Sequence, residues 1–125
     1  MFYISFYDIS IMDIEGEPVK STEHVTDSMF YIMAALTEPR HGYAIMTLIE
    51  ETSKGAVVIG PASMYTIIKK MLNLDWIYLF DATDARRKTY ALTISGQEVL
   101  MKEIDVRKQL IELAEASMNQ KGGKG

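Results

Sequence analysis

The sequence predicts a mainly α-helical domain with one small β-hairpin, an α+β fold around a single core. The first observation is size, because 125 residues with 48% apolar and 24% charged side chains match one ordinary globular domain. The second is the order of patterns along the chain. Three short segments with helical spacing of apolar residues come first, then two aromatic and β-branched runs, then one long helical segment.

The composition excludes several classes of protein. The chain has no cysteine, so it has no disulfide scaffold, thiolate zinc site or cysteine nucleophile. Its apolar stretches are shorter than the roughly 18–20 residues that a membrane span needs. No Lys or Arg precedes Asp8, so the apolar start lacks the basic residues of a secretory signal. We therefore expect a soluble, cytoplasmic protein without membrane contacts.

Residues 1–25 form an N-terminal extension to which the sequence assigns no role. An alternating aromatic and aliphatic run at 2–7 leads into a polar connector at 15–23. The run fits a short strand and an added helix turn equally well.

Two short helices follow this extension. Good N-cap residues at 26–28 precede apolar residues at helical spacing, which predicts a first helix reaching about Thr37, before Pro39. A second amphipathic pattern begins after Gly42 and reaches about Thr52.

The third predicted helix has one apolar and one polar face. Pro61 suits its first turn. The residues expected to face inward are Met64, Ile67, Ile68 and Met71. The other side carries Ser63, Thr66, Lys69 and Lys70, with Tyr65 beside them.

Two strands are predicted at 76–80 and 89–92, because both runs are rich in aromatic and β-branched residues. The connection between them is polar and carries the basic cluster Arg86, Arg87 and Lys88. The pattern therefore predicts a hairpin with a cationic tip.

The last helix is predicted over 94–118, followed by a flexible glycine-lysine tail at 119–125. Its apolar residues form two adjacent stripes, wider than the roughly 100° that packing on one small body requires. A patch of this width would be unusual on a monomer, so we expect a homodimer. The residues expected at its interface are Phe30, Met33, Val99, Ile104, Val106, Leu110, Ile111 and Leu113.

Charge is unevenly distributed along the chain. The net charge is −4. Residues 1–53 hold nine acidic and two basic side chains, whereas residues 54–93 hold six basic and three acidic ones. A basic region on an acidic body is typical of a protein that binds nucleic acid.

Three helices followed by a basic hairpin, over 26–93, is the order of a winged helix-turn-helix DNA-binding domain. The residues that sharpen this interpretation are His41-Gly42-Tyr43, Pro61-Ala62-Ser63-Met64-Tyr65 with Lys69-Lys70-Met71, and the run from Arg86 to Gly96. Together these segments resemble the PadR family of bacterial transcriptional regulators. The resemblance covers about 27–118.

The resemblance implies a homodimeric repressor that binds an inverted-repeat operator in double-stranded DNA and releases it when a small molecule binds. One residue departs from the family pattern. Asp75 stands where the family usually has glycine, between the third helix and the first wing strand. Asp tolerates a left-handed backbone better than most residues, so we expect the turn to survive.

Nine residues are the candidate DNA contacts. Short polar side chains on the third helix suit contacts with base edges, and lysines and arginines suit phosphates. A hydroxyl at the start of the second helix would add another phosphate contact. For both Tyr43 and Tyr65, packing in the core is the alternative to a DNA contact. The candidates are Tyr43, Ser63, Tyr65, Thr66, Lys69, Lys70, Arg86, Arg87 and Lys88.

No catalytic, metal or cofactor site is expected. His24 and His41 have no partner at ligand spacing, and no nucleophile elbow or glycine-rich phosphate loop is present. We therefore expect a protein that is not an enzyme. Nine methionines suit a small apolar effector, and core packing and chain starts explain them equally well. Trp76 could stack on an aromatic effector, but a tryptophan at the base of a wing is more often a core residue.

Two other functions fit the same sequence. A winged helix used for protein interaction would agree with the acidic net charge and with the departure at Asp75. A small-molecule binding protein without DNA function is the second alternative. Steep salt dependence of binding to a promoter duplex separates DNA binding from both.

Overall fold

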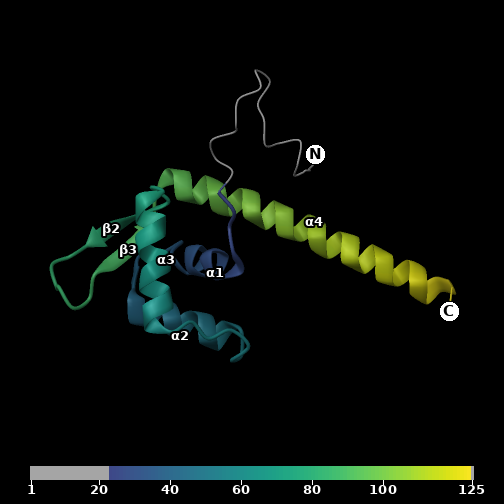
Figure 1. Ribbon diagram of the computed structural model, residues 1–125, viewed down its shortest axis with the longest axis horizontal. Helices are drawn as coiled ribbons and strands as arrows, with labels where there is room; N and C mark the ends of the chain where they lie inside the picture. The colour runs from purple at the N-terminus through teal and green to yellow at the C-terminus, as the bar shows by residue number, and fades with distance from the viewer. Residues whose placement is uncertain (1–22, 125) are drawn as a thin grey trace, which may run out of the picture.

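The computed structural model describes residues 23–124, and most of the proposed N-terminal extension therefore lies outside the described residues. The elements are α1 (Asp27–Ala35), β1 (Arg40–His41), α2 (Gly42–Thr52), α3 (Pro61–Asn73), β2 (Ile77–Asp81), β3 (Thr89–Leu92) and α4 (Ile94–Lys124). Three short helices and a small sheet form a body from which the long α4 projects (Figure 1). The predicted fold class, mainly α with a β-hairpin, is confirmed.

Side chains cap the first two helices. The Thr26 hydroxyl accepts a hydrogen bond from the Met29 N–H at 3.1 Å, as expected of an N-cap threonine. At α2 the cap is His41, whose Nδ1 accepts from the Ala44 N–H at 3.3 Å. His41 thus has a structural role that its sequence context did not indicate.

The turn after α3 is a Schellman motif centred on Asp75. The Trp76 N–H donates to the Met71 carbonyl at 3.0 Å, and the Asp75 N–H donates to the Leu72 carbonyl at 3.1 Å. Asp75 has φ +62°, in the left-handed region. The expectation that aspartate supports this turn in place of glycine is confirmed.

The sheet has three antiparallel strands in the order β1-β3-β2. The two predicted strands are present as β2 and β3, with Tyr78 opposite Ala91 and a register shift between Leu79 and Asp81. Strand β1, in which Arg40 pairs with Tyr90, was not predicted from the sequence. A two-residue strand has no periodicity of its own, and only its partner β3 defines it.

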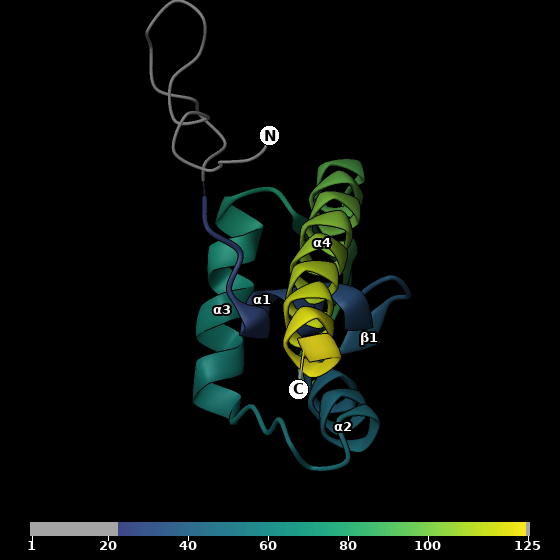
Figure 2. The ribbon, with the colours of Figure 1, turned by 90° about the vertical axis from the view of Figure 1, so that its right-hand side faces the viewer.

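The core lies where α1, α2 and α3 meet the sheet. Figure 2 shows α3 to the left of α1 and α2 below it. Its largest fully buried side chains are Ile32, Met33, Leu36, Ile45, Met64, Ile68, Met71 and Ile77. Trp76 is also buried, with 8% of its surface exposed. It is therefore a core residue and not an open stacking platform for an effector.

The long helix α4 begins at a close contact with the turn after α3. A Cβ on Gly96 would lie 1.9 Å from the Trp76 carbonyl oxygen, so only glycine fits there. From this point α4 packs against β3 and α1 and then leaves the body. The helix continues to Lys124, so residues 119–124 are helical. The prediction that the helix ends at about Met118 and is followed by a flexible tail is therefore wrong for these residues. No proline interrupts this last segment, and two glycines weaken a helix by only about 1 kcal/mol each.

Within residues 23–124, no helix is both long and apolar enough to cross a membrane.

Candidate nucleic-acid interface

One face of α3 is polar and open to solvent. Met64, Ile68 and Met71 are buried on the inner side of the helix. The predicted contacts Ser63, Thr66, Lys69, Lys70 and Tyr65 are all exposed. Packing of the inner side thus leaves the predicted reading face accessible along the helix.

The two lysines of this face differ in their partners. Lys70 Nζ lies 2.8 Å from Glu23 Oε2, an ion pair with the chain segment that precedes α1. Lys69 has no ion-pair partner within the described part of the chain. A DNA phosphate would therefore have to displace the Glu23 carboxylate before it could bind Lys70. At Lys69 a phosphate would displace no carboxylate of the described residues.

Tyr65 packs toward the start of α2. A Cβ on Gly42 would lie 2.5 Å from the Tyr65 hydroxyl oxygen, so glycine is what allows this approach. Half of the Tyr65 surface stays exposed. Burial raises the pKa of the nearby Tyr90 hydroxyl, and the charge of Tyr65 raises it further. The phenol ring of Tyr65 thus has a packing role in addition to its predicted DNA contact.

Tyr43 occupies the second position of α2 and is 71% exposed. Its side chain is not part of the core. The start of a helix favours negative charge because its first N–H groups point outward. This position therefore agrees with the predicted phosphate contact of Tyr43.

The tip between β2 and β3 presents Arg86, Arg87 and Lys88, which are all exposed. Its two aspartates bond to the loop itself. Asp81 Oδ1 accepts from the Thr83 N–H at 2.8 Å and from the Thr83 hydroxyl, and these bonds lower the pKa of Asp81. Asp84 Oδ1 accepts from the Arg86 backbone N–H at 2.9 Å. The carboxylates therefore shape the loop, and the basic side chains point outward.

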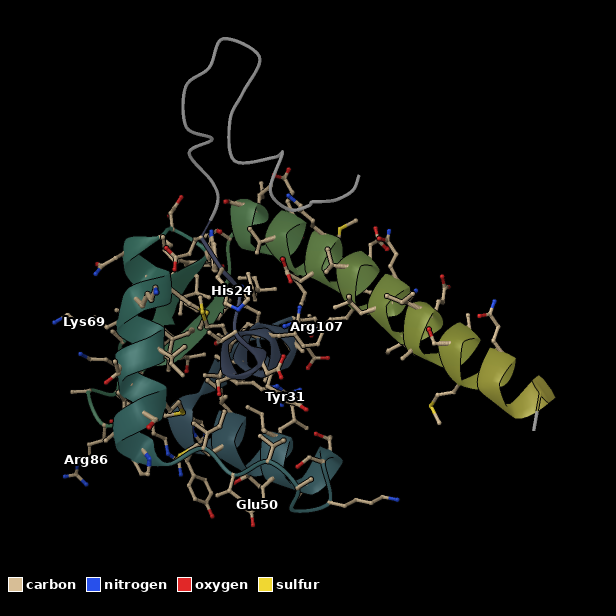
Figure 3. The ribbon with its side chains drawn as sticks, turned by 45° about the vertical axis from the view of Figure 1, so that its right-hand side comes forward. His24, Tyr31, Glu50, Lys69, Arg86 and Arg107 are labelled. Atoms are coloured by element: carbon tan, nitrogen blue, oxygen red, sulfur yellow. The ribbon has the colours of Figure 1, made fainter. Side chains whose placement is uncertain are left out.

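The two basic regions share one side of the molecule. In Figure 3 the side chains of Lys69 and Arg86 both point away from α4, one from α3 and the other from the hairpin tip. Glu50, an acidic residue of α2, lies apart from both of these basic side chains in the same view. The structure thus brings together an exposed helix face and a cationic loop that are well separated in the sequence.

Apart from Met33, the predicted interface residues fall into two groups. Leu110, Ile111 and Leu113 are 57–64% exposed on the projecting part of α4, where Met118 is also exposed, at 72%. Val99 and Ile104 are partly buried against the core of the same chain, and Phe30 and Val106 are half-buried.

Met33 is fully buried in the core of its own chain, with 0% of its surface exposed. It packs inside the body because it shares a face of α1 with Met29 and Ile32. Met33 is therefore left out of the surface that a second copy could contact.

Three or more metal-ligating side chains do not come together anywhere in the part of the chain that the structure describes. His41 is engaged at the α2 N-cap. A shallow hollow on α3 is lined by Ala62, Ser63, Thr66 and Ile67, so it includes two residues of the predicted reading face, Ser63 and Thr66.

Comparisons with known proteins agree with this architecture. A family model described as "Transcriptional regulator PadR-like family" matches residues 31–102, which is more than half of the chain. No curated protein sequence is significantly similar to the chain.

Solved structures with the same fold include RosR and two proteins described as transcription regulators of the PadR type. RosR of H. salinarum has 20% identity and a TM-score of 0.60, and the match covers 78% of this chain and 96% of RosR. A PadR-like transcription factor of B. fragilis has 22% identity and a TM-score of 0.59, covering 69% of this chain and 84% of its own. A PadR family transcription regulator of Clostridium difficile R20291 has 24% identity and a TM-score of 0.51, covering 73% and 93%.

Proposed function

Because the chain belongs to the PadR-like family of transcriptional regulators, we propose that it is a dimeric, sequence-specific DNA-binding repressor. The members of this family are transcription regulators and not enzymes, so the chain is not an enzyme. From the same family membership we propose that residues 26–93 form a winged helix-turn-helix domain and that residues 94–118 form a dimerisation helix.

The exposed polar face of α3 carries the proposal of DNA reading. Ser63 and Thr66 are short enough to let the helix approach base edges, and Lys69 extends to phosphates. Lys70 joins them when it releases Glu23. These side chains suit the major groove, which admits one α-helix.

The hairpin tip supports a second contact with the same duplex. Arg86, Arg87 and Lys88 extend from a loop whose aspartates are engaged with the loop backbone. Long cationic side chains on such a loop bind phosphates with little dependence on sequence. The tip therefore strengthens binding, and α3 selects the sequence.

The projecting part of α4 supports dimerisation. Leu110, Ile111, Leu113 and Met118 would leave large apolar side chains in water along one helix. A second copy of the chain would cover them and place two α3 helices at successive major grooves, about 34 Å apart. This spacing corresponds to an inverted-repeat operator.

Repression and its release by a small apolar or aromatic effector are the finer part of this proposal. They come from the family resemblance. In this chain, an effector would release DNA by changing the position of α3 relative to α4.

The test is binding to the DNA upstream of the chain's own gene, measured by fluorescence anisotropy at several salt concentrations. A random-sequence duplex of equal length is the control. We expect tighter binding to the upstream DNA and a steep loss of affinity with salt, with a slope of about −0.9 for each phosphate neutralised. Equal, salt-insensitive affinity for both duplexes would favour a protein-interaction module instead.

A further inference from the structure

Arg107 of α4 contacts the first part of α1 and a carboxylate of its own helix. Its Nη2 donates to Asp27 Oδ1 at 3.1 Å and to the Val25 carbonyl oxygen at 3.3 Å, both at the start of α1. Its Nη1 donates to Glu103 Oε1 at 2.6 Å, one turn earlier on α4. The guanidinium carbon lies 4.3 Å from the ring centre of Phe30.

These contacts form one compact cluster. Arg107 is flanked by two carboxylates and stacked on an aromatic face, with only 23% of its side chain exposed. A planar guanidinium with several donors can bond two acceptors and stack on a ring at once, which an ammonium cannot do. Figure 3 places Arg107 between α4 and α1.

Arg107 is also the last residue of α4 that the body covers. Residues 108–120 are all exposed. From Lys108 to Lys124 the helix projects for about 25 Å without support from its own chain, at a rise of about 1.5 Å per residue. The contacts up to Arg107 therefore determine the direction of this arm.

We infer that Arg107 is a positioning residue that sets the angle between α4 and the DNA-reading body, and thereby the distance between the two α3 helices of the dimer. The inference rests on the proposed dimeric, DNA-binding function. Arg107 itself touches no DNA in this arrangement, because it lies on the side of the body that carries α4.

The distance between the two α3 helices of the dimer is sensitive to the angle between α4 and the body. A change of about 10° at Arg107 displaces the end of a 25 Å arm by about 4 Å. Successive base pairs lie about 3.4 Å apart along the duplex. A small error in the angle therefore shifts the half-site spacing by about one base pair.

The absence of cysteine offers a direct test. A single Cys introduced at the exposed Glu51 of α2 accepts one spin label per chain, so any measured label-to-label distance joins two protomers. Pulsed electron paramagnetic resonance then gives the distribution of that distance in the full chain. The variants are Arg107→Gln and Arg107→Lys, and Lys108→Gln is the matched control on an exposed neighbour.

We expect a narrow distribution of the label-to-label distance in the labelled chain with Arg107 unchanged, and the same in the Lys108→Gln control. Arg107→Gln should broaden it by about twofold, because the charge-assisted, two-pronged contact is lost. Arg107→Lys should broaden the distribution less than Arg107→Gln does, since lysine keeps the charge but loses the fork and the stacking. If Arg107→Gln reduces helicity by circular dichroism, Phe30→Leu removes the stacking ring in its place and should broaden the distribution in the same way.

Two outcomes would overturn the inference and can be told apart. An unchanged distance distribution in dimers of folded Arg107→Gln or Phe30→Leu rejects the role of Arg107 and leaves the proposed function intact. The absence of any distance between labels at micromolar concentration means that the chain is not a dimer, and the proposed function then fails together with the inference.

Discussion

The Thr93 hydroxyl donates a hydrogen bond to the Asp75 carbonyl oxygen at 2.6 Å and so ties the turn after α3 to the start of α4. The Thr93 hydroxyl oxygen also accepts a hydrogen bond from the Gly96 N–H at 2.9 Å, which caps α4. The Thr93 N–H in turn donates to the Trp76 carbonyl at 3.0 Å. One threonine thus joins the proposed reading helix to the proposed dimerisation helix.

Thr93→Val should therefore lower the free energy of unfolding by about 1–2 kcal/mol, because one helix cap and one bond between elements are lost. Urea unfolding followed by circular dichroism measures this loss. Thr52→Val is the control, since the Thr52 hydroxyl bonds only within its own helix, to the Leu48 carbonyl at 2.7 Å. Equal losses in the two variants would show that Thr93 does not join the elements.

Asp75→Gly should raise the free energy of unfolding by about 0.5–1 kcal/mol. Relief of a left-handed residue, worth about 1–2 kcal/mol, exceeds the added entropy of glycine in the unfolded chain. Lys54→Gly tests the same reasoning at the other non-glycine residue with positive φ among the described residues, at +55°. Lys69→Gly, at an exposed position in the interior of α3, should instead destabilise by about 0.5–1 kcal/mol, and a similar loss in Asp75→Gly would contradict this explanation of the turn.

Lys69→Ala should weaken DNA binding more than Lys70→Ala, because Lys70 must first release Glu23. We expect the salt slope to flatten by about one unit in Lys69→Ala. Glu23→Gln should strengthen binding to random-sequence DNA, and this gain should disappear in a Lys70→Ala background. Unchanged affinity in the double variant Lys69→Ala with Lys70→Ala, with circular dichroism intact, would discard α3 as the reading helix.

Replacing Arg86, Arg87 and Lys88 together by Ala should lower affinity for operator and random DNA alike, because a cationic tip responds to charge more than to sequence. Anisotropy titrations with both duplexes measure the two affinities. A variant that keeps its affinity for random DNA but no longer prefers the operator would assign base reading to the tip instead.

Leu110→Asp with Leu113→Asp should abolish dimers and operator binding together, although both residues lie on the projecting arm away from the reading face. Analytical ultracentrifugation and anisotropy measure the two effects. Gln109→Asp with Ser117→Asp is the charge-matched control at exposed polar positions of α4. A folded monomer of the unaltered chain that binds the operator at micromolar concentration would refute the proposed dimer.

The sequence by itself determined the fold class, the order of the helices and the two main strands. Helical spacing of Met64, Ile68 and Met71 predicted which side of α3 would be buried, and the same spacing indicated which side would remain polar. Local signals of this kind are sufficient because capping, periodicity and turn chemistry act within a few residues. The left-handed turn at Asp75 was expected from the family resemblance, because the family usually has glycine at this position.

Only the tertiary structure decided which side chains of distant segments meet. The pairs Lys70–Glu23, Tyr65–Gly42 and Arg107–Asp27 each join different elements. The placement of Met33 in the core and the two-residue strand β1 also depend on neighbours from elsewhere in the chain. Such contacts have no local period or spacing in the sequence, because they arise only when packed elements bring remote residues within a few ångströms of each other.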